Sequence, residues 1–419
     1  MTIDFELSPR IKATKNMIHM FAETAVRPIA RQYDEQEHEK PWELLGMVQK
    51  FMGSGVAGAF GTEKKDKEKE KDAEPKEKKP RETNLAGAIT IEEIFWGDAG
   101  IALAFPGPGL GGAAVQASGT PEQKEKFLAR FSGEKPVWGA MAITEPEAGS
   151  DTANIKTTAV LDGDEWVLNG EKIFVTSGKS ALEDSEGFVV VWATVDRKAG
   201  RAGIKPFIVE HGTPGMEITK IEDKLGIRCS DTVSISFMDC RIPKDNILGS
   251  PEVVDKTKTE GFKKVMATFD ATRPLVAAMA IGVGTAALDF IKQTLKEEGV
   301  ELRYGINPHR MTSLERDIMQ MEADLKAARL LTWRSLWMLD NGLRNDLQAS
   351  MAKAKAGLAV TRITQKAVEI MGPIGYSREY LLEKWMRDSK INDIFEGTGQ
   401  IQLLVTARRV LGFTREQLK

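Results

Sequence analysis

Cysteine and histidine are scarce in this chain, and their scarcity excludes several classes of protein. Only two cysteines, Cys229 and Cys240, and four histidines occur among 419 residues. Two thiols cannot build a disulfide scaffold, a zinc ribbon or a zinc finger. The histidines lie far apart and none belongs to an H-E-x-x-H pattern, so each is expected to be an ordinary surface or packing residue. We therefore expect no metal site, and acid–base chemistry would rest on carboxylates or a cofactor.

An excess of charge of one sign and long apolar runs are also absent. The 58 basic and 61 acidic residues give a net charge of −3, which offers no electrostatic attraction for nucleic acid or an anionic membrane. No run approaches the roughly 20 apolar residues that a membrane helix needs. The N-terminal sequence MTIDFELSPR lacks the layout of a signal peptide. We expect a cytoplasmic protein with no nucleic-acid or membrane partner.

The periodicity of apolar residues changes twice along the chain, which predicts three domains in an α+β multidomain fold. Residues 1–136 are expected to be mainly helical, residues 137–250 to form a mostly antiparallel β domain, and residues 251–419 to be helical again. The residues at helical spacing that support this are Ile18, Phe21, Ala25 and Ile29, then Leu325, Ala328, Leu331, Ser335 and Leu339, then Ala352, Ala356, Ala359 and Ile363. Further helices are expected over 41–51, 85–95 and 398–411.

Six strand-like segments fall in the middle region, and two dipeptides there are typical of hairpins. Asp162-Gly163 and Asn169-Gly170 are both expected to turn the chain between strands. No long helices alternate with the strands, so a parallel βαβ sheet is not expected. The predicted strands span 137–143, 157–161, 165–168, 188–194, 205–210 and 233–239.

A highly charged segment interrupts the first helical region. From Glu63 to Glu82, 17 of 20 residues are charged, nine basic and eight acidic. Such a segment cannot bury enough apolar surface to offset its ordering entropy. We interpret it as a solvated insertion; a loop that docks a partner is the alternative.

A glycine-rich run contains a nominal G-x-G-x-x-G at Gly107, Gly109 and Gly112. A dinucleotide fingerprint requires a preceding strand and a βαβ unit. Helical pattern precedes this run and Pro108 lies inside it, so a turn between helices is expected.

Two segments have residue types that packing does not easily explain. The first is Thr144–Asp151, whose glycine permits close backbone approach and whose hydroxyls can donate; a plain turn after a strand is the alternative. The second is Phe395–Gln400, in which Glu396 lies between an apolar pair and two glycines. Burial beside apolar groups would raise the pKa of this carboxyl toward the range of a general base. The alternative is a helix start with Thr398 as N-cap.

Five motifs in order make the chain resemble the acyl-CoA dehydrogenases over nearly its whole length. They are A-I-T-E-P-E-A-G-S-D at 142–151, N-G-E-K-I-F-V-T-S-G at 169–178, K-L-G-I-R-C-S-D-T at 224–232, F-D-A-T-R-P at 269–274 and E-K-W-M-R-D-S-K-I-N-D-I-F-E-G-T-G-Q-I-Q at 383–402. The resemblance implies an N-terminal helical domain, a middle β domain and a C-terminal four-helix bundle, usually in a homodimer or homotetramer.

The resemblance also implies an activity. Members of this family are FAD-dependent oxidoreductases of acyl-CoA metabolism, such as β-oxidation. They convert an acyl-CoA thioester to a trans-2-enoyl-CoA and pass electrons to an electron-transfer flavoprotein. Glu396 matches the general base that removes the α proton, while flavin N5 accepts the β hydride. The backbone N–H of Glu396 matches a donor to the thioester carbonyl, in an arrangement like an oxyanion hole.

Other site residues carry over from the matching motifs. Those expected to contact the flavin cofactor are Met141, Ile143, Thr144, Gly149, Ser150, Phe174, Val175, Thr176, Thr398 and Gln400. Those expected to contact the substrate are Ser150, Asp270, Arg273 and Gly397. Phe174 stands where many members have Trp, a change that preserves an aromatic face.

Departures from the family pattern gather at the expected pyrophosphate–adenosine end of FAD. Glu301 occupies the position of an arginine contributed by a neighbouring subunit, with Arg303 as a possible substitute. Glu369 replaces a glutamine, and Pro373 removes a backbone donor. An anion near a pyrophosphate is unfavourable without an intervening cation. These departures suit one alternative, a subunit of a heteromeric dehydrogenase. A second alternative is a non-catalytic, acyl-CoA-binding or scaffolding member that uses the charged insertion as a docking arm. Direct reoxidation by oxygen is a third, and acyl-chain specificity is not indicated.

Overall fold

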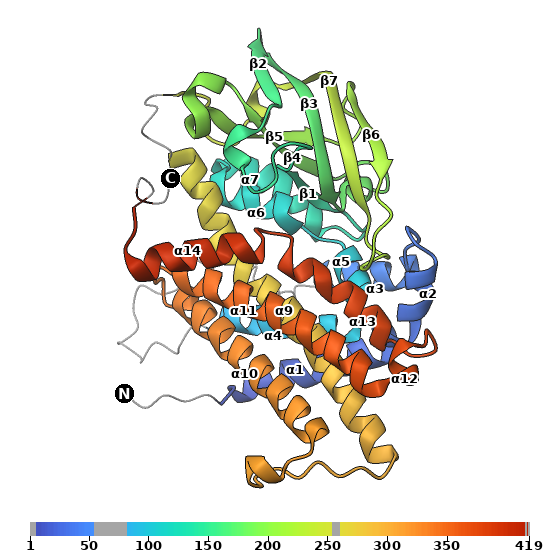
Figure 1. The fold of residues 1–419 in the computed structure, drawn as a ribbon. Coiled ribbons are helices and arrows are strands. Elements are labelled where there is room, and N and C mark those ends of the chain that lie inside the picture. The colour runs from blue at the N-terminus through green and yellow to red at the C-terminus, as the bar shows by residue number, and fades with distance from the viewer. Residues whose placement is uncertain (1–5, 54–81, 254–259, 415–416, 418–419) are drawn as a thin grey trace, which may run out of the picture.

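The computed structural model describes residues 6–53, 82–253, 260–414 and 417. The charged segment 63–82 falls almost entirely outside these residues, so its interpretation stays a prediction. A curled β sheet lies above a layer of long helices, and the N-terminal helices lie between and beside them (Figure 1). This arrangement of helical, β and helical parts confirms the predicted fold class. The domain boundaries after residues 136 and 250 stay predictions.

The N-terminal part is helical. A π turn, η1 (Ala22–Val26), and a 3-10 turn, η2 (Arg27–Ile29), join its first two helices, and another 3-10 turn, η4 (Ala129–Ser132), ends it. Its helices are α1 (Pro9–Phe21), α2 (Ala30–Glu35), α3 (Trp42–Gly53), α4 (Thr83–Gly97), α5 (Ala99–Ala104), α6 (Gly109–Ser118) and α7 (Pro121–Leu128). α7 begins with a capping box in which Thr120 and Gln123 bind each other's backbone amides.

The middle part is a seven-stranded sheet in the order β1-β4-β2-β3-β7-β6, with β5 paired to β4. Its strands are β1 (Gly139–Ala142), β2 (Thr158–Asp162), β3 (Glu165–Thr176), β4 (Phe188–Thr194), β5 (Ile204–Glu210), β6 (Met216–Ile221) and β7 (Thr232–Pro243). Short helical elements join them: η5 (Thr152–Asn154), α8 (Gly178–Leu182), η6 (Arg197–Gly203) and η7 (Lys244–Asn246). All seven residues of β4 are buried, as expected of a strand covered on both faces.

The mostly antiparallel sheet is confirmed, with three differences in detail. β1 and β2 each pair with β4 in parallel. β6 was not predicted, because only Met216, Ile218 and Ile221 give it an apolar pattern between charged residues. The hairpin expected at Asn169-Gly170 is wrong.

At Asn169-Gly170 the chain continues along β3, and its pairing with β7 shifts between Leu168 and Gly170. Gly170 has φ +146° and lies against Thr157. The dipeptide therefore marks a β-bulge, which uses the same conformational freedom as a turn. The hairpin at Asp162-Gly163 is confirmed, since Asp162 and Glu165 are paired.

The C-terminal part contains four long helices: α9 (Glu260–Glu297), α10 (Ser313–Asp340), α11 (Asp346–Met371) and α14 (Gly399–Leu411). Shorter elements are η8 (Pro308–Arg310), α12 (Pro373–Tyr376), α13 (Leu382–Ser389) and η9 (Lys390–Asp393). The predicted apolar faces of α10 and α11 are at least partly buried throughout. The glycine-rich run is a turn only up to Pro108, because α6 begins at Gly109.

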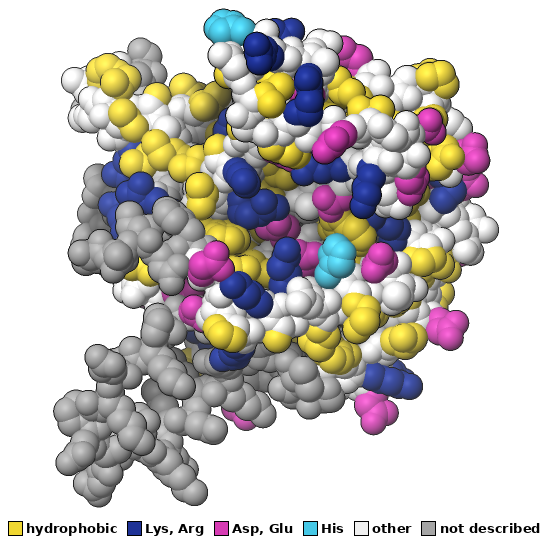
Figure 2. All heavy atoms as spheres, turned by 90° about the horizontal axis from the view of Figure 1, so that it is seen from below, with side chains coloured by type: hydrophobic (Ala, Val, Ile, Leu, Met, Phe, Trp, Pro, Cys, Tyr) yellow, Lys and Arg dark blue, Asp and Glu magenta, His cyan; other side chains and the backbone are white. Residues whose placement is uncertain are grey.

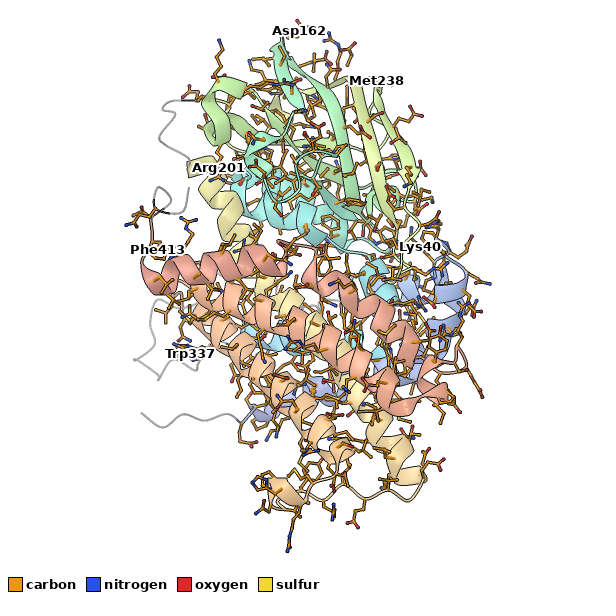
Figure 3. All side chains as sticks on the ribbon, viewed as in Figure 1. Lys40, Asp162, Arg201, Met238, Trp337 and Phe413 are labelled. Carbon is orange, nitrogen blue, oxygen red and sulfur yellow. The ribbon has the colours of Figure 1, made fainter. Side chains whose placement is uncertain are left out.

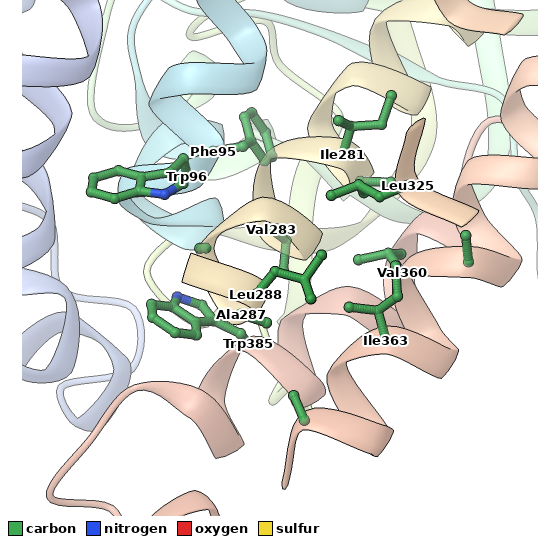
Figure 4. Close-up of a cluster of buried hydrophobic side chains, with 14 of the residues drawn as sticks. Phe95, Trp96, Ile281, Val283, Ala287, Leu288, Leu325, Val360, Ile363 and Trp385 are labelled. Atoms are coloured by element: carbon green, nitrogen blue, oxygen red, sulfur yellow. The ribbon is translucent and has the colours of Figure 1, made fainter. Parts of the chain in front are cut away.

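The largest core joins the N-terminal and C-terminal helices (Figure 4). Phe95 and Trp96 from α4 pack there with α9, while Leu325, Val360 and Trp385 come from α10, α11 and α13. A side chain from the β domain also enters, since Ile227 is buried in this cluster. The three parts of the chain are thus packed together through shared side chains.

Among the described residues, Ala271–Glu297 of α9 is long and apolar enough to cross a membrane by length and composition. However, 72% of its 18-residue apolar window is buried inside the protein, as in a core helix. On the underside of the molecule, basic and acidic side chains are interspersed with hydrophobic ones (Figure 2). This face therefore carries both signs of charge rather than an excess of one.

Candidate active site

Glu396 lies in the turn between η9 and α14, in an unusual backbone conformation. Its φ is +52°, and Gly397 follows with φ +91°. A left-handed conformation at a non-glycine residue costs about 1–3 kcal/mol and persists only where surrounding contacts fix it. Thr398 then caps α14 by accepting from the Ile401 amide at 3.3 Å. The N-cap alternative for Thr398 is therefore confirmed, and Glu396 lies just before that cap.

The Glu396 carboxylate is half-buried and turned toward α9. Thr272 Oγ1 donates to Glu396 Oε2 at 2.7 Å. Burial raises the pKa of the Glu396 carboxyl, while the Thr272 hydroxyl and the positive charges of Lys353 and Arg273 act in the opposite direction. Burial is the largest influence, so this carboxyl holds a proton more readily than one in water.

Two segments predicted for the flavin are joined by the backbone. β1 runs into Ile143 and Thr144, and the carbonyl of Thr144 accepts from the Ile173 amide of β3 at 2.9 Å. This bond aligns the end of β1 with residues 174–176. The motif around Thr144 and the motif around Phe174 are thus one structural unit, as the resemblance implies.

A buried ion pair fixes the same junction. Lys172 is fully buried, and its Nζ binds Glu145 Oε1 at 2.7 Å and the Ile143 carbonyl at 3.1 Å. Glu145 also accepts from the Thr157 amide at 2.9 Å and from its hydroxyl at 2.6 Å. Burial lowers the pKa of Lys172 to about 8. The network holds the chain leading into residues 146–151.

Phe174 presents an aromatic ring to the outside. The residue is 61% exposed and has φ +56°, and Ser177 nearby has φ +59°. An exposed aromatic face can stack against a flat ring, and a left-handed backbone at a non-glycine residue is a feature that gathers at functional sites. Val175 beside it is buried at 1% exposure. Met141, Ile143, Thr144 and Thr176 are half-buried, whereas Gly149 and Ser150 are exposed.

The remaining predicted contacts are spread over α9 and α14. Arg273 on α9 is buried and lies near Glu396 and Lys353. Gln400, at the start of α14, is exposed. Asp270 lies on α9 where the structure describes the backbone alone, so its predicted contact with CoA stays a prediction.

Two residues of this site were missed by sequence reasoning. Thr272 lies within the F-D-A-T-R-P motif, but only the fold brings it to Glu396. Lys353 is fully buried on α11 and donates to the Gly397 carbonyl at 2.7 Å. The sequence feature that could have identified Lys353 is its position directly beside Ala352, on the small-residue face of a core helix.

The departures at the expected adenosine end have partners in this chain. Arg303 binds Glu315 through two nitrogens, at 2.7 and 2.8 Å, so its suggested role as a substitute would require that pair to open. Glu369 is paired with Lys366 at 2.8 Å. Pro373 begins α12, where a missing N–H leaves no helical bond unmade.

Two cavities open elsewhere on the molecule. One, of about 450 Å³, is lined by Arg130, Val137, Glu186, Glu210 and His211. The other, of about 160 Å³, is lined mainly by residues 153–156, Arg197 and Ile204. Neither is lined by a residue predicted for the active site.

Ligand atoms of Glu37, His38 and Asp223 lie within 4.8 Å of one another, so these residues could hold a cation. That site is empty. Glu37 is already paired with Arg228, and the expectation that the protein has no metal site stays a prediction.

Comparison with known proteins identifies the family. Residues 140–240 match the acyl-CoA dehydrogenase middle domain, and residues 259–411 match the C-terminal domain. The short-chain specific acyl-CoA dehydrogenase of Clostridium acetobutylicum is 32% identical over 97% of this chain and 100% of its own. The short-chain specific mitochondrial enzyme of Bos taurus is 39% identical over 78% of this chain and 76% of its own.

Solved structures agree. Butyryl-CoA dehydrogenase from Megasphaera elsdenii has a TM-score of 0.81 and 32% identity, covering 98% of this chain and 100% of its own. The chain is equally similar to a structure from work on the electron transferring flavoprotein of Acidaminococcus fermentans and flavin-based electron bifurcation. That structure has a TM-score of 0.81 and 33% identity, and the match covers 98% of this chain and 100% of its own. The chain belongs to the acyl-CoA dehydrogenase family and is an oxidoreductase.

Proposed function

We propose that this protein oxidises a short-chain acyl-CoA thioester to its trans-2-enoyl-CoA, with FAD as cofactor and Glu396 as general base. The observation that carries the proposal is the half-buried Glu396 carboxylate, held by Thr272 at the head of a left-handed turn. The choice of short acyl chains rests on the similarity to the short-chain specific acyl-CoA dehydrogenases of Clostridium acetobutylicum and Bos taurus.

Glu396 removes the proton from the α carbon of the thioester. Burial favours the protonated carboxyl, which makes the ionised form a stronger base than a carboxylate in water. The backbone N–H of Glu396 donates to the thioester carbonyl oxygen and stabilises the charge that develops there. Gly397 adds no side chain beside the thioester. Ser150 and Arg273 bind the CoA portion of the substrate, and Asp270 on α9 contacts the same portion.

The residues facing the predicted cofactor site suit a flavin. Phe174 offers an exposed aromatic face, and the bond between Ile173 and Thr144 holds the two flavin-facing segments in register. When bound, FAD supplies the acceptor for the hydride from the β carbon. The residues proposed to hold it are Met141, Ile143, Thr144, Gly149, Ser150, Phe174, Val175, Thr176, Thr398 and Gln400.

We propose a homo-oligomer, a dimer or tetramer, as the assembled form. One side of α14 exposes apolar side chains that the described residues leave largely uncovered: Leu403, Leu404, Val410 and Leu411 are 56–62% exposed. Trp337 and Phe413, 52% and 43% exposed, lie along the same edge of the helical part (Figure 3). Several exposed apolar side chains on one side of a helix are typical of a protein interface. A heteromeric enzyme is the alternative, favoured by Glu301 and Glu369 at the expected adenosine end.

An electron-transfer flavoprotein is the proposed electron acceptor, supported by the description of the Acidaminococcus structure. This assignment is tested by mixing the substrate-reduced enzyme with an electron-transfer flavoprotein and following the reduction of that flavoprotein. Peroxide release on oxygen consumption would identify an oxidase instead.

The activity is tested with purified full-length protein and a panel of acyl-CoAs of increasing chain length. We expect flavin absorbance, bleaching by short-chain acyl-CoA, and turnover that falls with longer chains. E396Q should bind flavin and substrate but lose at least about 100-fold of kcat. E125Q, an exposed carboxylate on α7, is the matched control and should keep full activity. A colourless protein would favour the non-catalytic alternative, and full turnover by E396Q would refute the assignment of the base.

A further inference from the structure

The turn that carries Glu396 rests on α11. Gly357 of α11 lies so close to the η9 segment that an added Cβ would come within 2.8 Å of the Asn392 carbonyl oxygen. Four residues earlier on the same helix, Lys353 sends its Nζ to the Gly397 carbonyl at 2.7 Å. Residues one helical turn apart share a face, so a single face of α11 contacts the chain on both sides of Glu396.

Lys353 is an unusual residue to find in that position. It is fully buried, yet among the described residues no carboxylate oxygen lies within 4 Å of its Nζ. Burying an ammonium group without a close counter-ion costs several kcal/mol, and leucine or methionine would fill the same space without that cost. A buried, unpaired lysine beside a reacting carboxylate therefore points to a functional role.

The turn has a second anchor on α14. Gln402 Nε2 lies 3.3 Å from the Gly397 carbonyl and 3.4 Å from the Glu396 carbonyl. These bonds are long, whereas the bond from Lys353 has the length typical of a charge-assisted contact. Lys353 is thus the stronger of the two anchors that hold the left-handed conformation of Glu396.

Charged groups on three elements lie near Glu396 and Lys353. Arg273 on α9 and Lys353 on α11 act on Glu396, Asp393 on η9 acts on Lys353, and Thr272 adds an uncharged donor to Glu396. Burial lowers the pKa of Lys353 to about 8, against the opposing influence of Asp393 and Glu396. At neutral pH the lysine is still mainly protonated, and its charge favours the ionised form of Glu396.

We propose that Lys353 is a positioning residue for dehydrogenation: its buried ammonium anchors the Gly397 carbonyl, fixes the turn that presents Glu396 and favours the ionised form of that base. This proposal rests on the proposed role of Glu396. It assigns Lys353 no contact with substrate or flavin.

The test compares K353M, K353Q and K353R in the full-length flavin-loaded enzyme. K353M removes both the charge and the donor, K353Q keeps a donor without charge, and K353R keeps the charge. K355M is the matched control on the same helix, because Lys355 is partly exposed and pairs with Asp324. Flavin content, Tm, KM, and kcat from pH 5 to pH 9 are measured for each variant.

K353M is expected to lower kcat by roughly tenfold to a hundredfold while flavin content stays within twofold of the unchanged enzyme. The acid limb of its kcat profile should move to higher pH by about one unit, because a nearby cation is lost. K353R should return the acid limb of the kcat profile to the pH of the unchanged enzyme. K353Q should recover part of kcat, but its acid limb should stay at the higher pH. K355M should change at most the Tm.

A kcat and acid limb in K353M equal to those of the unchanged enzyme would overturn the proposal. So would a loss of stability without a shift of the limb. If K353M does not fold, the same readouts on K353Q decide, since its limb must still move. E396Q separates the two proposals: full turnover by E396Q refutes the base itself, whereas an inactive E396Q with an unaltered K353M refutes only the role of Lys353.

Discussion

At the scale of single residues, the Glu396 carboxyl is subject to opposing influences that set its pKa. Burial raises the pKa, and the hydroxyl of Thr272 together with nearby positive charges lowers it. A general base is most effective when its pKa lies near the working pH. Under the proposed role of Glu396 as general base, this balance determines the pH at which activity begins as the pH rises.

Replacing Thr272 with valine tests that balance. The substitution conserves shape but removes the donor that lies 2.7 Å from Glu396 Oε2. Loss of a hydrogen bond to the ionised form raises the pKa of the carboxyl, by about one to two units for a bond worth about 1.5–3 kcal/mol. Activity requires the ionised form, so the acid limb of kcat in T272V should move to higher pH.

The pH profile of kcat, measured with a saturating short-chain acyl-CoA, checks this expectation. T272S retains the hydroxyl and should keep the limb of the unchanged enzyme. If T272V and T272S have the same limb, the hydroxyl does not control the ionisation of Glu396.

The sequence identifies one residue of the site clearly and gives no indication of how two others reach it. Glu396 stood out because a carboxylate between an apolar pair and two glycines is unusual. Thr272 and Lys353 are 124 and 43 positions away from Glu396, and although Thr272 lies in a recognised motif, nothing in the sequence connects either residue to Glu396. Contacts between distant helices depend on how those helices pack, which no local pattern specifies.

At the scale of elements, the junction between β1 and β3 depends on the buried pair of Lys172 and Glu145. Replacing Lys172 with methionine leaves a buried carboxylate without its cation, which typically costs about 3–5 kcal/mol. Because Lys172 also binds the Ile143 carbonyl, the segment proposed to face the flavin should loosen, and K172M should have both a lower Tm and a weaker affinity for FAD.

Thermal unfolding and flavin titration of the apoprotein measure the two effects of K172M. The double variant K172M/E145Q removes both charges and should recover part of the stability. A Tm equal to that of the unchanged protein would show that the pair is not needed to hold the junction.

The crossing of α9 and α4 offers a second prediction at this scale. A Cβ added at Gly282 would lie 2.2 Å from the Glu92 carbonyl oxygen, so G282A must force the two helices apart. Overpacking of this kind costs about 1–3 kcal/mol. Gly46 on α3 has no atom within 4 Å of an added Cβ, and G46A should instead raise stability by about 0.5–1 kcal/mol.

Denaturant unfolding followed by circular dichroism compares the two alanine variants. The expected outcome is an opposite sign for the two changes in unfolding free energy. Equal effects would mean that the close contact at Gly282 does not limit the packing of α4 on α9.

Elements with regular apolar periodicity were predicted well from the sequence, and irregular ones were not. β4 was placed at its observed bounds because its apolar run is continuous. β6 escaped because charged residues alternate with its few apolar ones, and the bulge at Gly170 was mistaken for a hairpin because both need the same backbone freedom. Where a local signal has two structural uses, only pairing with a distant strand decides between them.

At the scale of the whole molecule, the uncovered apolar side of α14 bears on how the chain assembles. Leu403 and Val410 lie two turns apart on that side and are 59% and 61% exposed. Burying a leucine or valine side chain contributes about 1.5–3 kcal/mol, so a charge at both positions should oppose any interface formed there. The double variant L403E/V410E is therefore expected to dissociate the proposed homo-oligomer.

Sedimentation and native mass spectrometry measure that dissociation. V160E is the matched control, since Val160 on β2 is 62% exposed but belongs to the distant sheet, and it should leave the assembly unchanged. If the unchanged chain is monomeric, poor in FAD, and assembles only with an unlike dehydrogenase subunit, the heteromeric alternative is correct. Glu301 would then bring negative charge to the expected pyrophosphate site, whereas Glu369 is already paired with Lys366, and an unlike partner would have to supply the missing cation.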